Sequence, residues 1–254
     1  MSEKKRARFT ILEMVPSMIT MMALFFGLWA LRAAIVGDFG TAIYCVVISC
    51  LLDKVDGGIA RKLKVSSEFG AQMDSLADFF DFGIVPGFIV YLWLMQDYYP
   101  FPQMAWLPVL LLAACMAIRL ARFNVSLSKE DLENPLNKYF FKGIPAPMAA
   151  SLVLFPLILS FEYPNLDIKP CMLIMNTVLM ALLAGSTIPT PCFKKIEFKP
   201  IYKKISLLLK IVLLFGLLVE TWCAAILICT FYIASVVVSW FFYCRFRSKL
   251  GKNS

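Results

Sequence analysis

The sequence predicts an all-α, polytopic membrane protein with about eight transmembrane helices. Hydrophobic residues make up 60% of its 254 residues and charged residues only 17%, and the mean hydropathy is +0.76, which is too apolar for a soluble globule. The lysines and arginines gather in five clusters, which four pairs of apolar stretches separate. By the positive-inside rule, this alternation gives eight helices with both termini in the cytoplasm.

The individual helices follow from the same alternation. Basic clusters lie at residues 4–8, 61–64, 119–142, 194–204 and 245–252, whereas the turns near 37–40, 96–100, 161–166 and 220–222 carry almost no basic residue. The predicted spans are 16–36, 39–61, 69–95, 105–123, 145–161, 171–187, 205–220 and 222–243. The first apolar run is longer than a signal-peptide core, so we predict a retained helix there.

Composition excludes several kinds of chemistry. The chain has no histidine, which rules out Ser-His-Asp triads and His-ligated zinc. Its eight cysteines lie mostly in apolar spans without a CxxC spacing, and we interpret them as small core residues. The net charge of +8 follows the membrane topology, so we predict no nucleic-acid partner.

Four aspartates stand out in this apolar chain, because ionisable groups at membrane depth are costly and mark functional sites. The second helix is apolar only from Thr41 to about Leu52, roughly 18 Å, whereas a hydrocarbon core is about 30 Å thick. The helix must therefore continue through Asp53 and Asp56, near the cytoplasmic side of the membrane.

Helical spacing brings the four carboxylates together. One face of the second helix carries, at i, i+3, i+4 and i+7, the residues Asp53, Asp56, Gly57 and Ala60. Asp74 and Asp78 are four residues apart at the start of the third helix. The connection over residues 62–68 is short enough to make the two helices an antiparallel pair. All four carboxylates can then face one small volume.

Carboxylates at close range resist ionising together unless a cation neutralises them. An all-oxygen ligand set favours Mg²⁺ or Mn²⁺, with Ca²⁺ as a further candidate, and two bridged ions would suit a substitution at phosphorus. Gly57, Ala60 and Gly70 leave room for a flat ligand, and Arg61 can bind a phosphate. The alternatives are close helix packing for the small residues and a cation or proton pathway for the acids.

The full string is Asp53-x2-Asp56-Gly57-x2-Ala60-Arg61-x8-Gly70-x3-Asp74-x3-Asp78. It resembles the signature of the CDP-alcohol phosphatidyltransferase family in all eight defining positions. The resemblance implies that Asp53, Asp56, Asp74 and Asp78 bind the divalent ions and that Asp78 is also the catalytic base. It further implies that the CDP-diacylglycerol head is bound by Gly57, Ala60, Arg61, Ser67 and Gly70.

Flanking motifs resemble the branch of this family that uses L-serine as the acceptor. They are Asp74-Ser75-Leu76-Ala77-Asp78, Phe82-Gly83-x2-Pro86, Arg119-x2-Arg122-Phe123-Asn124, Lys142-Gly143-Ile144-Pro145-x-Pro147 and Ser186-Thr187-Ile188-Pro189-Thr190. The resemblance implies phosphatidyl transfer from CDP-diacylglycerol to L-serine with release of CMP. Other acceptors of the same class, glycerol phosphate, inositol phosphate or choline, remain the nearest alternative, and a cation or proton transporter is the alternative from another class.

The acceptor pocket needs a cation for the serine carboxylate and an acceptor for its ammonium. Arg119, Arg122 and Lys142 are the candidate cations, although positive-inside charge explains Lys142 equally well. Asp81, one turn beyond Asp78, would hold the ammonium or else lie on a wet helix face.

The resemblance also bears on organisation. It covers a six-helix core, so we predict a catalytic membrane domain at residues 1–195 and a C-terminal transmembrane hairpin at 196–254. It implies a homodimer surrounded by membrane lipids, and it favours the bacterial cytoplasmic membrane, with the active site on the cytoplasmic side.

Overall fold

The computed structural model describes residues 11–63, 68–96, 102–126, 140–191, 216 and 219–250. Within these ranges the chain is almost entirely helical. In chain order the elements are α1 (Ile11–Ile35), α2 (Phe39–Leu63), α3 (Glu68–Asp78), η1 (Phe79–Ile84), α4 (Val85–Gln96), α5 (Pro102–Ser126), β1 (Phe140–Lys142), α6 (Ala146–Glu162), α7 (Pro170–Gly185), β2 (Pro189–Pro191) and α9 (Thr221–Leu250).

The predicted helices agree with these elements to within a few residues, with three differences. The third helix contains a π-helical segment, η1, between α3 and α4. The last helix, α9, continues to Leu250, beyond the predicted end at 243. A short antiparallel ribbon of β1 and β2, which the all-α prediction lacked, joins two loops. The predicted span 205–220 lies almost wholly outside the described residues.

Among the residues that the structure describes, four helical stretches are long and apolar enough to cross a membrane. They are Val15–Ile35, Phe69–Gln96, Met104–Val125 and Thr221–Trp240. The shorter helices α6 and α7 are also apolar. The remaining long helix, α2, ends in Asp53, Lys54, Asp56 and two further basic residues, so its apolar part is short, as the sequence predicts.

The first two helices form a tight hairpin. Gly37 has φ +84°, a conformation that favours glycine, and it reverses the chain directly after α1. Asp38 then caps α2, since its carboxylate accepts a hydrogen bond from the Thr41 N–H at 2.9 Å. Hydrogen bonds from Thr41 lower the pKa of the exposed Asp38 carboxylate below its usual value.

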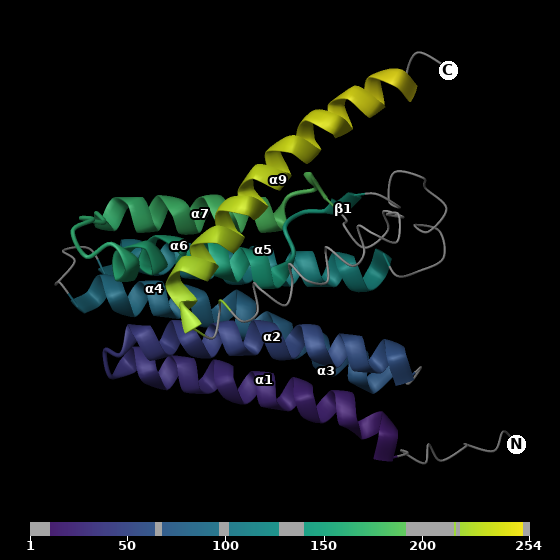
Figure 1. The fold of residues 1–254 in the computed structure, drawn as a ribbon, viewed down its shortest axis with the longest axis horizontal. Helices are drawn as coiled ribbons and strands as arrows, with labels where there is room; N and C mark the ends of the chain where they lie inside the picture. Colours follow the sequence, from purple (N-terminus) through teal and green to yellow (C-terminus); the bar gives the residue numbers. More distant parts are fainter. Residues whose placement is uncertain are drawn as a thin grey trace, which may run out of the picture.

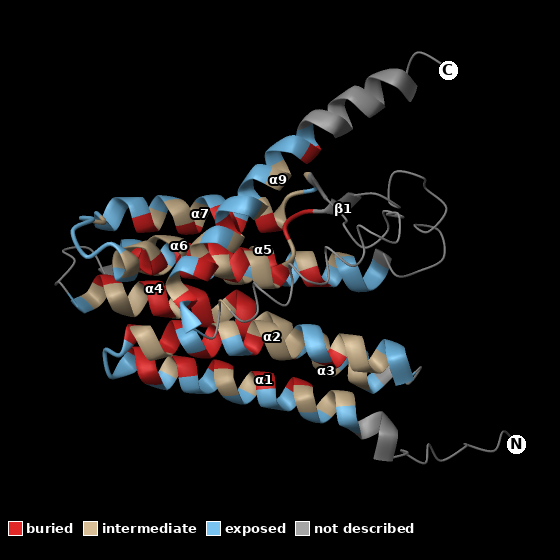
Figure 2. Cartoon of the chain, viewed as in Figure 1, coloured by how far each residue is buried: buried red, intermediate tan, exposed pale blue. Residues whose placement is uncertain are grey.

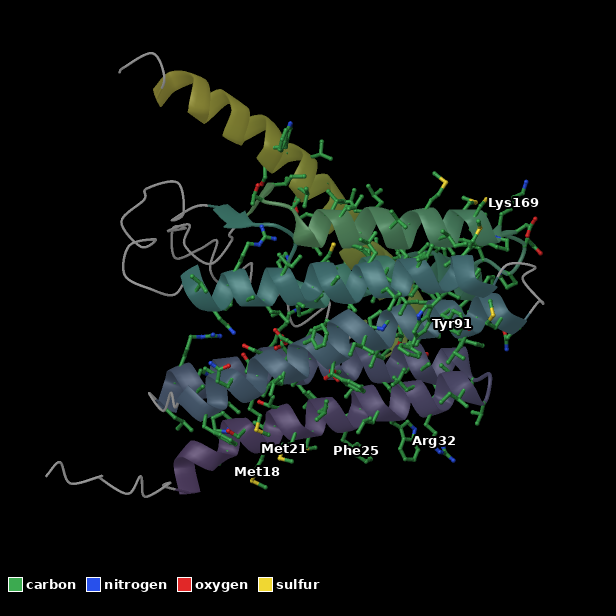
Figure 3. The ribbon with its side chains drawn as sticks, turned by 180° about the vertical axis from the view of Figure 1, so that it is seen from behind. Met18, Met21, Phe25, Arg32, Tyr91 and Lys169 are labelled. Carbon is green, nitrogen blue, oxygen red and sulfur yellow. The ribbon has the colours of Figure 1, made fainter. Side chains whose placement is uncertain are left out.

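The helices pack as two groups around α4. Figure 1 shows α1 and α2 side by side along one edge, α5, α6 and α7 stacked on the other, and α9 crossing the bundle obliquely. The buried residues face inward between these groups (Figure 2), with Ile43, Phe82, Val85 and Leu154 among those almost fully enclosed. Met18, Met21 and Phe25 point outward from α1 (Figure 3), which suits a surface in contact with lipid acyl chains.

The β1–β2 ribbon brings together two distant motifs. Phe140, Phe141 and Lys142 pair with Pro191, Thr190 and Pro189. Gly143, at φ +82°, donates its N–H to the Ile188 carbonyl at 2.8 Å. The ribbon therefore joins the start of α6 to the end of α7, at the same end of the bundle as the start of α3 (Figure 1).

Candidate active site

The aspartates of α2 and α3 converge as their helical spacing predicts. Asp53, Asp56 and Asp74 each offer a carboxylate oxygen, and these three oxygens lie within 4.8 Å of one another. Asp78 lies outside this close group of three but lines the same pocket and interacts with both Asp53 and Asp74. Three hard oxygen ligands from two helices form a group that could hold a divalent metal ion.

The carboxylates line a small pocket with an empty volume of about 170 Å³. The other contributors come from α1 and from the chain that follows α3: Thr20, Ala23, Ala77, Asp81 and Phe82. The wall of the pocket therefore includes residues of α1, a helix that lies outside the sequence string carrying the four aspartates. The acids thus line two sides of this pocket, one on α2 and the other on α3 and η1.

Thr20 orients one of the carboxylates. Its Oγ1 lies 2.7 Å from Asp56 Oδ2 and 3.1 Å from the Pro16 carbonyl oxygen, and both Thr20 and Asp56 are buried. The second Asp56 oxygen accepts a hydrogen bond from the Gly57 N–H. Sequence reasoning missed Thr20, because one polar residue in an apolar first helix carries no spacing signal.

Asp81 lies deep in the bundle. Its side chain is 2% exposed, and its Oδ2 accepts a hydrogen bond from the buried Ser49 Oγ at 2.5 Å. The interpretation that Asp81 lies on a wet face is therefore wrong. The reason is that Asp81 belongs to η1, a π-helical segment of the kind that often occurs at functional sites. This segment packs against α1, α5 and α6, and Ser49 of α2 reaches Asp81 by its hydrogen bond.

The second Asp81 oxygen fits against a glycine of α1. Oδ1 has no hydrogen-bond partner among the described residues, and a Cβ added at Gly27 would overlap it. Gly27 thus lets α1 approach η1 closely enough to enclose Asp81. Sequence reasoning missed Gly27, because the helix that carries it meets Asp81 only in three dimensions. It also missed Ser49, although Ser49 lies four residues before Asp53 on the same face of α2.

We expect Gly27→Ala to destabilise the protein by about 1 to 3 kcal/mol, because the added methyl must displace the Asp81 carboxylate or the α1 backbone. The control is Gly58→Ala, since nothing lies within 4 Å of a Cβ at that position and a helical glycine-to-alanine change is favourable by about 0.5 to 1 kcal/mol. Thermal unfolding in detergent measures both. Equal midpoints for the two variants would show that α1 does not pack tightly on Asp81.

Two half-buried arginines of α5 tie the bundle together beside the aspartates. Arg119 Nε donates to the Ile144 carbonyl at 2.7 Å, and its Nη1 is buried without a partner among the described residues. Arg122 Nη2 donates to the Gly185 carbonyl and lies 3.4 Å from the Ser186 carbonyl oxygen, at the end of α7. Arg119 has the Asp53 and Asp78 charges among its neighbours.

The predicted nucleotide-lipid contacts lie along the end of α2. A Cβ at Gly57 would lie 3.4 Å from Arg61 Nη1, so the guanidinium folds back over the glycine. Ala60 is half-buried and Arg61 is exposed. Gly70 lies in the first turns of α3, whereas Ser67 lies outside the described residues.

Another link holds α3 against α5. Ser75 Oγ and the Asn124 amide lie 3.1 to 3.2 Å apart, and both residues belong to the motifs quoted above. Lys142 is in β1, paired in register with Pro189, and its side chain is not among those described. The structure thus gathers the flanking motifs at the end of the bundle that holds the aspartates.

Comparison with known proteins bears on the chemistry of this site. The sequence profile of the CDP-alcohol phosphatidyltransferase family matches residues 13–189, which include every aspartate of the pocket. The chain belongs to the CDP-alcohol phosphatidyltransferase family. Membership of this family, together with four apolar helices of spanning length, makes it an integral membrane protein whose reaction class is phosphatidyl transfer.

Several curated relatives carry one name, CDP-diacylglycerol--serine O-phosphatidyltransferase. The relative from Helicobacter pylori is 35% identical over 188 residues, which cover 74% of this chain and 76% of that protein. The relative from Bacillus subtilis is 32% identical over 181 residues, covering 71% and 92%. The relative from Mycobacterium tuberculosis strain H37Rv is 32% identical over 152 residues, covering 60% and 51%.

Proposed function

We propose that this protein is a phosphatidylserine synthase, which transfers the phosphatidyl group from CDP-diacylglycerol to L-serine and releases CMP. The observation that carries this proposal is the convergence of Asp53, Asp56 and Asp74 beside Asp78 in one pocket. The names of the relatives support serine as the acceptor.

In this mechanism Asp53, Asp56 and Asp74 hold two divalent ions, Mg²⁺ or Mn²⁺, with Asp78 as a further ligand. Bound there, such ions neutralise the carboxylates and the charge that develops on the leaving phosphate. Arg61, exposed at the end of α2, binds the pyrophosphate. Gly57, Ala60, Ser67 and Gly70 complete the contacts to the nucleotide-lipid head.

The chemical step is a substitution at the phosphorus that carries diacylglycerol. The serine hydroxyl oxygen forms a bond to this phosphorus, while the bond to the CMP oxygen breaks and CMP leaves with the electron pair. Asp78 accepts the hydroxyl proton, because a serine hydroxyl is a poor nucleophile near neutral pH. The interactions of Asp78 with Asp53 and Asp74 support this role, because the proposed ions would then lie beside the base.

The serine carboxylate would bind Arg119, whose Nη1 is buried without a partner among the described residues. Arg122 is a weaker candidate, since its Nη2 already binds the end of α7, and Lys142 remains a candidate by its place in the ribbon. Asp81 would attract the ammonium from the floor of the pocket. A cation for the carboxylate and Asp81 for the ammonium would favour the binding of serine over acceptors that carry a phosphate and no amine.

The acceptor is tested with purified protein, CDP-diacylglycerol and a panel of serine, glycerol phosphate, inositol phosphate and choline. We expect CMP release that depends on serine, with phosphatidylserine as the lipid product. Transfer to another alcohol alone would replace the proposed acceptor and keep the reaction class. A transporter would release no CMP with any acceptor, and it is disfavoured because the acids gather in one pocket instead of being distributed along the helices.

The arrangement in the membrane is part of the proposal. Eight helices, residues 1–195 as the catalytic domain and 196–254 as a C-terminal hairpin would place both termini and the pocket in the cytoplasm of a bacterium, in a homodimer. The basic clusters at the ends of the spans support this orientation. Reporter fusions to each terminus check it.

A further inference from the structure

Two hydrogen bonds hold the carboxylate of Asp56. Its Oδ2 lies 2.7 Å from the Thr20 Oγ1, and its Oδ1 accepts a hydrogen bond from the Gly57 N–H. Asp56 also supplies one of the three carboxylate oxygens that lie within 4.8 Å of one another. Because each oxygen of Asp56 has a donor, the carboxylate group cannot rotate without losing a hydrogen bond. Asp56 therefore has a fixed orientation in the pocket.

The hydroxyl of Thr20 differs from an ordinary threonine hydroxyl in a helix. Threonine side chains commonly donate to the carbonyl four residues earlier, as the buried Thr177 Oγ1 does to the Leu173 carbonyl at 2.9 Å. Thr20 Oγ1 has two acceptors, the Pro16 carbonyl at 3.1 Å and Asp56 Oδ2 at 2.7 Å, but only one proton. The ionised carboxylate is the nearer and stronger acceptor, so Thr20 donates to Asp56.

The packing of α1 fixes the position of this hydroxyl. Thr20, Ala23 and Gly27 are spaced at i, i+3 and i+7, which places them on one face of α1. Thr20 and Ala23 line the aspartate pocket, and a Cβ at Gly27 would overlap the Asp81 carboxylate. This close contact lies about two helical turns from Thr20 and limits how far α1 can shift. The hydroxyl therefore reaches Asp56 from a helix that the packing holds in place.

A carboxylate of fixed orientation distinguishes between divalent ions. Mg²⁺ requires a nearly octahedral set of close oxygen ligands, whereas Ca²⁺ takes more ligands at longer distances and commonly binds both oxygens of one carboxylate. To present both oxygens to one ion, Asp56 would have to turn away from the Thr20 hydroxyl or the Gly57 N–H. The two donors thus favour coordination through one oxygen, which suits Mg²⁺ or Mn²⁺ better than Ca²⁺.

We propose that Thr20 is a positioning residue of the ion site, which holds Asp56 as a one-oxygen ligand and so makes the site prefer Mg²⁺ or Mn²⁺ to Ca²⁺. This inference rests on the proposed function only through its ion site, and it does not depend on the acceptor. It distinguishes ions that the aspartates alone do not, because all three ions accept carboxylate oxygens. It also gives α1 a part in the chemistry of a site whose ligands all lie on other helices.

The test removes the Thr20 hydroxyl and measures ion binding without any substrate. Purified protein is freed of ions with a chelator, and the unfolding temperature is followed as Mg²⁺, Mn²⁺ or Ca²⁺ is added, which gives a dissociation constant for each ion. In Thr20→Val we expect the constants for Mg²⁺ and Mn²⁺ to rise about 10- to 100-fold, the usual effect of losing a hydrogen bond to a metal ligand. The constant for Ca²⁺ should change less, so the preference for the smaller ions narrows.

Two further variants separate positioning from packing. Thr177→Val is the matched control, because Thr177 is also buried and donates only to a carbonyl four residues earlier, so all three constants should stay unchanged. Thr20→Ser keeps the hydroxyl and should keep the ion preference of the wild type. If Thr20→Val does not fold, Thr20→Ala removes the same hydroxyl without adding a methyl group in its place.

Unchanged constants for Mg²⁺ and Mn²⁺ in a folded variant without the hydroxyl would overturn the inference, and so would an equal rise for all three ions. A wild type that binds ions but releases no CMP with serine refutes the proposed function and leaves the role of Thr20 to be judged by the ion constants. A wild type whose unfolding temperature responds to none of the ions refutes both the ion site and this inference.

Discussion

Replacing Asp78 with asparagine should lower the turnover of phosphatidyl transfer by about 10²- to 10⁴-fold, the usual contribution of a general base. Asparagine keeps the size of the side chain but cannot accept the proton of the serine hydroxyl. CDP-diacylglycerol binding should persist, because Asp53, Asp56 and Asp74 form the close carboxylate group without Asp78.

This first experiment measures CMP release and, separately, the binding of CDP-diacylglycerol to the purified variant. Asp38→Asn is the control, because Asp38 caps α2 at the far end of that helix from the pocket and should leave turnover unchanged. Normal turnover in Asp78→Asn would remove Asp78 as the base. Loss of lipid binding together with turnover would assign Asp78 to the ion site alone.

Removing divalent ions with a chelator should abolish activity, by about 10³-fold or more, since ions at such sites stabilise the transition state by several kcal/mol. It should also lower the unfolding temperature, because Asp53, Asp56 and Asp74 would then repel one another at close range. At an ion concentration 100 times the dissociation constant, binding stabilises the folded state by about 2.7 kcal/mol. Mg²⁺ or Mn²⁺ should restore both properties.

The second experiment follows activity and the unfolding temperature while each ion is added back. Asp56→Asn is the matched variant: it keeps a hydrogen-bonding partner for Thr20 but removes one charge from the ion site. Its unfolding temperature should respond weakly to Mg²⁺ and Mn²⁺. Full activity in the chelator, or an undiminished response in Asp56→Asn, would contradict the proposed ion site.

Helix positions were predictable because the apolar runs and basic clusters of a membrane protein repeat along the chain itself. The starts of α2 at Phe39 and α6 at Ala146 are within one residue of prediction. The π-helical segment η1 was not predictable, since its residues Phe79–Ile84 have no local pattern that separates them from the helices on either side. Its conformation depends on the packing of α1, α5 and α6 around it.

The residues of the site also divide into those whose meeting the sequence predicted and those that it did not reveal. Asp53 and Asp56 share a helix face, and so do Asp74 and Asp78, so their spacing predicted that they meet. Ser49 lies on the same face of α2, four residues before Asp53, so its spacing carried a signal that sequence reasoning overlooked. Thr20 and Gly27 lie on α1, and they contact Asp56 or Asp81 across gaps of 36 and 54 positions in the chain. Such contacts leave no periodic signal in the sequence.

The sequence by itself determined that this is a helical membrane protein with an acidic site at the junction of its second and third helices. It could do so because helical periodicity and the cost of charge in a membrane act over neighbouring residues. Only the tertiary structure decided that Asp81 is enclosed by α1, that Arg119 and Arg122 bind the ends of other helices, and that Thr20 of α1 binds Asp56 of α2. These features depend on which helix faces meet, and that is fixed by side-chain packing between segments far apart in the chain.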